Sequence, residues 1–109
     1  MGRSANVVVD TVRIGEDWLF VVTGGKAHIG ATATVGEGKY GAIRELTELP
    51  GHKEGELALA LAERAAERLQ AIVSVVAGIH IPHATKEEIL QAVEDAYTAF
   101  EQKLSEVEA

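Results

Sequence analysis

The stretch Val73–Thr85, which reads VSVVAGIHIPHAT, decides the fold that we expect for this chain. Its first half is an unbroken run of β-branched and small apolar residues, which is typical of a strand covered on both faces. Its second half is a turn, after which Thr85 and Glu88 have the spacing of a capping box at the start of a helix. We therefore predict a buried strand that leads into the last helix through a turn carrying His80 and His83.

Upstream of this stretch, the pattern predicts three strands. Apolar and polar residues alternate over Val7–Ile14, which is typical of a half-buried strand, and we interpret a slip in the alternation near Asp10 as a β-bulge. A short polar turn follows, and the nearly all-apolar run Trp18–Thr23 predicts the second strand of a hairpin. Small residues alternate with threonines over Ala27–Val35, which predicts a third antiparallel strand.

The remaining segments predict two helices and a weaker strand. Residues 36–51 are interrupted by glycines and predict a loop or an edge strand, with an extended piece over Ala42–Leu49. Leucine and alanine then recur at helical spacing from about His52 or Glu54 to Gln70, and the apolar residues from Ile89 onward mark a long amphipathic helix.

The element order β-β-β-(β)-α-β-α predicts an α+β fold. We expect residues 1–109 to form a single domain, a two-layer sandwich with a mostly antiparallel sheet and two helices packed on one face. The last strand is either inserted into the sheet or added at an edge.

Composition excludes several classes of function. The net charge is −7, and the ten Lys and Arg residues are scattered without the basic cluster that nucleic-acid binding requires. Cysteine is absent, which excludes disulfides, thiolate metal sites and cysteine nucleophiles. No run approaches the roughly 18 apolar residues of a membrane span, and the polar start has no signal core, so we expect no membrane and a cytoplasmic protein.

Four histidines lie in three turns flanked by glycine: His28, His52, and the pair His80 and His83. One interpretation is a single pocket that receives all three turns, in which the glycines let a flat or bulky ligand approach the backbone. The alternative is that these histidines only satisfy hydrogen bonds of the loops in which they lie.

The segment before the first predicted helix could bind an anion. Free amides at a helix start attract phosphate, and Lys53 with His52 would add positive charge to an otherwise acidic chain. The alternative is that Lys53 is merely solvated and that Glu54 and Glu56 already satisfy the helix dipole.

A metal site is a further interpretation. His52, Glu54 and His80 supply nitrogen and oxygen ligands for a divalent cation, which would make the protein a small metal-dependent enzyme. The spacing typical of metalloproteases is missing, and no serine lies in a sharp exposed turn of the kind that presents a nucleophile.

The same turns resemble a known family. The motifs Thr23–Gly25, His28–Ala31, Leu49–Glu54, Ala77–His80 and Ala84–Ile89 occur in the order and spacing of the small D subunit of gallate-type hydroxyarylic acid decarboxylases. That subunit family is described as a prenylated flavin chaperone. The resemblance covers most of the chain.

The resemblance implies a non-catalytic partner that binds prenylated FMN, or FMN, and delivers it to the large decarboxylase subunit, with a purely structural subunit as the alternative. We also expect a homodimer, because two copies enclose a bulky ligand more easily than one small domain does. The family has an Asp-Asn pair where this chain has Pro82 and His83, so the resemblance gives His83 no role. His52 and His80 are also the candidate metal ligands. The cofactor-binding residues carried over from the family are Gly24, Gly25, His28, Gly30, Gly51, His52, Lys53 and His80.

Overall fold

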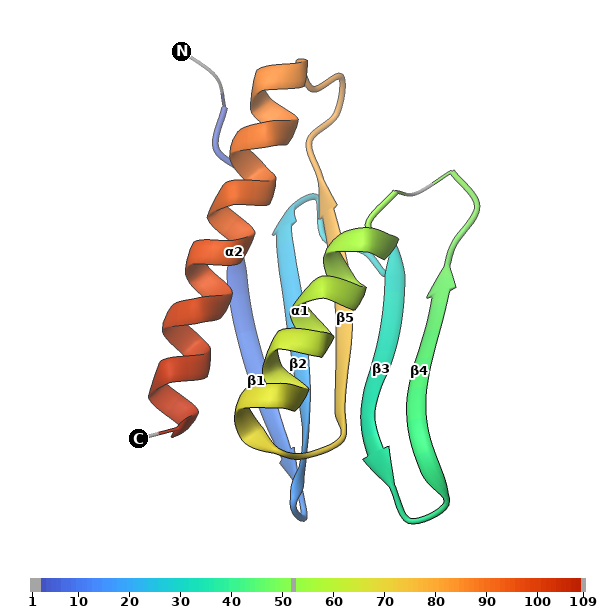
Figure 1. Cartoon of the computed structure of the whole chain (residues 1–109). Coiled ribbons are helices and arrows are strands. Elements are labelled where there is room, and N and C mark those ends of the chain that lie inside the picture. The colour runs from blue at the N-terminus through green and yellow to red at the C-terminus, as the bar shows by residue number, and fades with distance from the viewer. Residues whose placement is uncertain (1–2, 52, 109) are drawn as a thin grey trace.

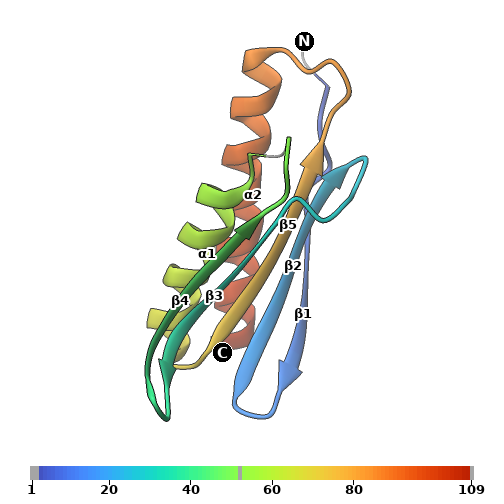
Figure 2. The same ribbon diagram turned by 90° about the vertical axis from the view of Figure 1, so that its right-hand side faces the viewer.

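The computed structural model describes residues 3–51 and 53–108. Within this part of the chain the elements are β1 Val8–Ile14, β2 Asp17–Gly25, β3 Ala31–Gly38, β4 Gly41–Glu48, α1 Gly55–Leu69, β5 Val73–His80 and α2 Lys86–Glu108. The strands form one sheet in the order β1-β2-β5-β3-β4, and both helices lie on the same face of it (Figures 1 and 2). The predicted α+β sandwich is confirmed.

β5 occupies the middle of the sheet, parallel to β2 and antiparallel to β3. The other two pairings, β1 with β2 and β3 with β4, are antiparallel. Of the two positions that the sequence left open for the last strand, the structure has the inserted one. Because β5 has a strand on each side, both edges of its backbone are hydrogen-bonded.

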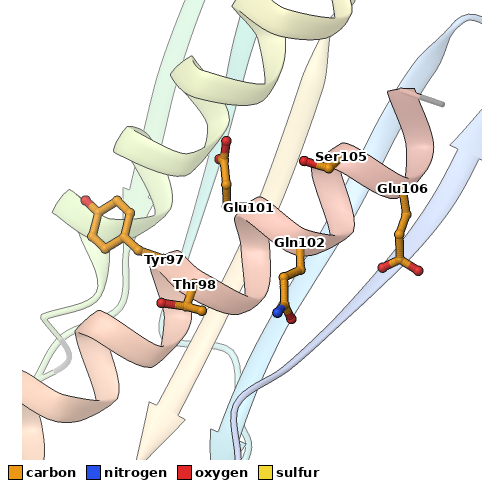
Figure 3. Close-up of a pocket in the computed structure, with 6 residues that line it drawn as sticks. All are labelled: Tyr97, Thr98, Glu101, Gln102, Ser105 and Glu106. Atoms are coloured by element: carbon orange, nitrogen blue, oxygen red, sulfur yellow. The ribbon is translucent and has the colours of Figure 1, made fainter.

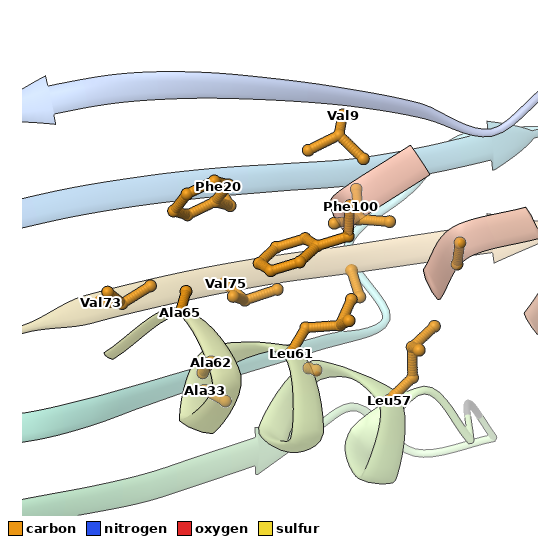
Figure 4. Packing of buried hydrophobic residues seen from close by; sticks show 14 of the residues in the cluster. Val9, Phe20, Ala33, Leu57, Leu61, Ala62, Ala65, Val73, Val75 and Phe100 are labelled. Carbon is orange, nitrogen blue, oxygen red and sulfur yellow. The ribbon is translucent and has the colours of Figure 1, made fainter. Parts of the chain in front are cut away.

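The core lies between the sheet and the two helices (Figure 4). Val75 of β5 pairs with Phe20 of β2 on one side and with Ala33 of β3 on the other, and all three side chains are buried. The Phe20 ring packs against Phe100 of α2 with 4.8 Å between ring centroids. α1 presents mainly alanines and leucines to β3 and β5, and such small side chains let a helix lie close to a sheet.

Three details differ from the sequence prediction. β3 begins at Ala31 rather than Ala27, because residues 26–30 form a loop that turns back over the end of β5. Residues 36–51, which predicted a loop or an edge strand, contain the edge strand β4. The pairing of β1 with β2 runs without interruption, so the predicted bulge at Asp10 is wrong. The slip in the apolar alternation of this strand arises because Val9 faces the helices while Val8 and Val12 lie on the other face of the sheet.

The sheet face opposite the helices, which we call the open face, carries no helix of the described residues, and the loop 26–30 lies over it at the C-terminal end of β5 (Figure 2). Val8, Val12 and Ile14 are 51%, 48% and 57% exposed there. The half of the open face formed by β3 and β4 is more polar, and Thr34 shares a hydrogen bond of 2.7 Å with Ser74 of β5. The run 73–77 predicted cover on both faces of its strand, but the chain itself covers only one.

Ion pairs connect the C-terminal halves of the helices. Arg64 of α1 lies 3.4 Å from Glu101 of α2, and Arg68 pairs with both Glu101 and Glu108. These side chains are partly exposed, and pairs of this kind contribute little to stability individually. They link the two helices at one end, while the N-terminal ends of the helices flank a pocket.

Candidate functional site

A pocket of about 410 Å³ lies between the start of α1 and the first turns of α2, over the C-terminal end of β5. Seven apolar side chains and five residues of another kind line it. The apolar ones are Leu57, Ile79, Ile81, Ala84, Ile89, Ala92 and Val93, and the others are Gly51, Lys53, Glu54, His80 and His83. A mainly apolar lining with a few polar groups is typical of a small-molecule site.

Two of the predicted turns line this pocket, and the third, the loop 26–30, contacts both of them through His28. The rings of His28 and His80 lie edge to face with 6.0 Å between their centroids. Nε2 of His28 is 3.5 Å from Oε1 of Glu54, and both side chains are mostly buried. The structure therefore brings together the loop 26–30, the turn before α1 and the end of β5. His52, a predicted cofactor and metal ligand, lies outside the described residues.

Two of the predicted site glycines, Gly25 and Gly30, serve internal packing, as does Gly78 of β5. A Cβ on Gly78 would overlap the backbone carbonyl of His28, and a Cβ on Gly25 would overlap the carbonyl oxygen of His80. A Cβ on Gly30 would overlap the carboxylate of Glu54. At these glycines the chain's own atoms fill the space that we predicted for a ligand. The role of these glycines is therefore to let neighbouring segments, including the loop 26–30 and β5, lie against one another.

Gly24 and Gly51 have different surroundings. Gly24 is buried beneath the N-terminal segment, where a Cβ would be 3.0 Å from the carbonyl oxygen of Ala5. Gly51 has a φ of +83°, and no atom of the described residues beyond its chain neighbours lies within 4 Å of the position its Cβ would take. Of the predicted glycines, Gly51 is therefore the one beside which a ligand has room, and it lines the pocket.

Carboxylates surround the start of α1. The Gly55 N–H donates a 2.8 Å hydrogen bond to Oε2 of Glu48, so one free amide of the helix start is already satisfied. Glu56 lies in the first turn of the helix. An anion at this end of the pocket would thus depend mainly on the charge of Lys53, which is exposed and lines the pocket.

The turn after β5 ends in the predicted capping box. The Thr85 N–H donates to Oε1 of Glu88 over 2.8 Å, and the Glu88 N–H donates to the Thr85 hydroxyl over 3.1 Å. Glu88 is 6% exposed, and Arg3, through its side-chain and backbone hydrogen bonds, is the main cause that lowers the pKa of Glu88 to about 2. The sequence indicated the cap but not the contact with Arg3, which is 85 positions away.

A second hollow lies along the C-terminal half of α2, where Tyr97, Glu101 and Ser105 are among its lining residues (Figure 3). All of its lining residues come from this one helix, and none is a predicted site residue. A ligand there would have a wall on one side only. We therefore take the pocket at the end of β5 as the candidate site.

A metal-binding cluster and a membrane-spanning helix are both absent from the described residues. In residues 3–51 and 53–108, no three His, Asp or Glu side chains are grouped closely enough to hold a metal ion. Glu54 and His80, two of the predicted ligands, lie at the pocket, and the third, His52, is not described. In the same ranges, no helix is long and apolar enough to cross a membrane.

Comparison with known proteins identifies the family. Residues 2–108 match the model of the prenylated flavin chaperone LpdD-like domain, so the chain belongs to this family. No curated protein matches the chain. The match covers nearly the whole sequence, including every turn that contributes to the pocket.

The packing of loop 26–30 on β5 predicts different effects for two glycine substitutions. Gly78→Ala places its methyl group against the rigid backbone of His28, whereas Gly30→Ala meets the flexible end of Glu54. We expect Gly78→Ala to lower the free energy of unfolding by about 1 to 3 kcal/mol, and Gly30→Ala by less. Urea denaturation measures both, and equal losses in the two variants would contradict this account of the loop.

Proposed function

We propose that this protein is a cytoplasmic, non-catalytic chaperone that binds prenylated FMN in the pocket at the end of β5 and delivers it to a prenylated-flavin-dependent hydroxyaryl acid decarboxylase. Membership of the prenylated flavin chaperone family supports the ligand class. The observation that carries the proposal is one mainly apolar pocket that is lined by the turn before α1 and the end of β5 and includes the exposed Lys53.

The lining suits the two chemical parts of a prenylated flavin nucleotide. The apolar wall, which includes Leu57, Ile79 and Val93, would bury the fused rings with their prenyl-derived carbons. Lys53, with His80 and His83 nearby, would hold the phosphate, since this is where the lining offers positive charge. His28 and Glu54 hold each other beside the pocket and would fix the position of His80.

The alternatives make different demands on the same residues. A metal-dependent enzyme would need His52 to join Glu54 and His80 around a cation. A purely structural subunit would need no pocket, and its surface would serve only to contact the large subunit. The chaperone proposal accounts for the apolar lining of the pocket. A protein that delivers its ligand must also bind it without a covalent bond, so that the ligand can leave again.

Ligand titration tests the proposal directly. Purified protein should bind prenylated FMN under anaerobic conditions more tightly than FMN, and far more tightly than inorganic phosphate, because only the first ligand uses the whole apolar wall. Affinity for prenylated FMN no greater than that for phosphate would end the proposal. Bound metal with hydrolytic or lyase activity of the isolated chain would favour the enzyme, and co-purification with the decarboxylase without any ligand would favour the structural subunit.

Lys53 provides a test of where the phosphate binds. Lys53→Glu should weaken nucleotide binding by about 1 to 3 kcal/mol, because a charge-assisted hydrogen bond is replaced by repulsion, and should leave the thermal midpoint unchanged. Lys39→Glu is the matched control, since it changes the net charge equally in the β3–β4 turn, at the opposite end of the strands from the pocket (Figure 1). Equal binding by both variants would move the phosphate away from Lys53.

We further propose that two copies pair through their open faces. The β1 and β2 half of this face exposes Val8, Val12 and Ile14, and large exposed apolar side chains that gather on one face are typical of an interaction surface. The apolar run of β5 is also typical of a strand covered on both sides, which pairing would achieve. The pocket lies on the helix side of the sheet, so this pairing would leave the pocket of each copy accessible.

Light scattering tests the pairing. The native chain should have twice the 11.6 kDa mass of one copy at micromolar concentration, and Val12→Asp should have the mass of a single copy. Tyr40→Asp is the control, because Tyr40 is 94% exposed in the β3–β4 turn, away from the apolar half of the open face. A native mass of 11.6 kDa, or a Val12→Asp variant that remains a dimer, would refute this interface.

A further inference from the structure

The wall of the pocket opposite α1 depends on the turn between β5 and α2. Ile81, His83 and Ala84 of this turn line the pocket. His83 has a φ of +55°, which is the left-handed region that side-chain-bearing residues rarely adopt. The Ala84 N–H donates to the Ile81 carbonyl over 3.2 Å. A turn with such a strained residue needs support from the structure around it.

Arg3 supplies support at both ends of this turn. The Arg3 backbone N–H donates to Oε2 of Glu88 over 2.7 Å, and Nε donates to the same oxygen over 3.1 Å. Nη2 of Arg3 donates to the Pro82 carbonyl over 2.7 Å and to Oε1 of Glu88 over 3.3 Å. One arginine thus joins the start of the turn to the first residues of α2.

The segment that carries Arg3 is itself anchored. Ala5 is 2% exposed, and its carbonyl accepts a hydrogen bond from the Gly25 N–H at the end of β2. Gly24 beside it leaves the space that Ala5 occupies. Residues 3–5, which we call the N-terminal strap, therefore run from the end of β2 to the start of α2 (Figure 1).

Glu88 is the residue of α2 to which the strap binds. It is the one charged side chain that is buried among residues 3–51 and 53–108. Of its two oxygens, Oε2 receives only Arg3, while Oε1 is shared between Arg3 and the Thr85 N–H of the capping box. A capping box needs only a carboxylate or amide oxygen at this position, so the burial of a full charge is explained by the strap rather than by the helix start.

We infer that Arg3 and Glu88 are positioning residues of the ligand pocket: the N-terminal strap holds the β5–α2 turn in the conformation that forms one wall of the pocket, so that ligand affinity depends on the strap. The identity of the ligand rests on the function proposed above. Because coupling between two sites is reciprocal, a ligand in the pocket must also stabilise the strap, although the strap does not line the pocket.

Two variants separate the strap from the helix cap. Arg3→Ala removes the side-chain hydrogen bonds of Arg3 to Glu88 and to the Pro82 carbonyl, and leaves only the backbone N–H of residue 3 to bind Glu88. Glu88→Gln keeps an oxygen for the Thr85 N–H, and glutamine is a normal residue of a capping box, but it removes the charge that Arg3 binds. Arg44→Ala is the matched control, because it deletes an exposed arginine pair with Glu63 at 3.2 Å between β4 and α1.

Anaerobic titration with prenylated FMN gives the first measurement. We expect Arg3→Ala and Glu88→Gln to bind about tenfold more weakly than the native chain, within the usual range of coupling between sites, and Arg44→Ala to bind as the native chain does. The measurement is made well below the thermal midpoint of every variant, so a merely structural role for Arg3 would leave the affinity unchanged. Unchanged affinity in both strap variants would overturn the inference.

Hydrogen exchange gives the second measurement, and its first part needs no ligand. Without ligand, the Ala84 amide should exchange faster in Arg3→Ala than in the native chain or in Arg44→Ala, because the turn has lost its support. With prenylated FMN, the Arg3 and Gly25 amides of the native chain should exchange more slowly. If the native chain does not bind prenylated FMN, the proposed ligand is wrong, and exchange at Ala84 still decides whether the strap holds the turn. Unchanged exchange at Ala84 would overturn the inference.

Discussion

The central position of β5 is the constraint on which the rest of the structure depends. Its backbone is hydrogen-bonded to β2 on one side and to β3 on the other, so these two strands and the loop between them must meet around its C-terminal end. Gly78 allows the loop to lie directly on the strand. The pocket follows from this arrangement, because the chain must leave the sheet after His80 and turn into α2.

The carboxylates around the pocket mostly bind other groups of the same chain rather than facing the pocket. Glu48 satisfies an amide at the start of α1, Glu54 lies against His28, and Glu88 binds Arg3 and the start of α2. Carboxylates in these positions hold the turns together in an acidic protein. Lys53 is the cationic residue of the lining and forms no ion pair with a carboxylate of the described residues, so its charge would be the chief attraction for the ligand proposed above.

The chain has apolar surface in two separate places. One is the pocket between the helices, and the other is the open face at β1 and β2. The phase slip in β1 is the sequence signature of the second, because valines on both faces of that strand serve the core and the open face at once. A small two-layer domain has only one face for its own core, so apolar residues on the other face are available for a second copy.

The sequence by itself determined the elements, their order, the α+β class and the family, because periodicity, capping and turn chemistry are local and the motifs recur at fixed spacing. It also placed His28 and Lys53 in turns, whereas His80, predicted in the turn after the buried strand, is the last residue of β5. Tertiary structure decided what those turns do. Three features bring together residues far apart in the sequence. They are the insertion of β5 into the sheet, the packing of the chain's own atoms against Gly25, Gly30 and Gly78, and the contact of Arg3 with Glu88. Such contacts depend on how the strands are ordered in space, and no local pattern encodes that order.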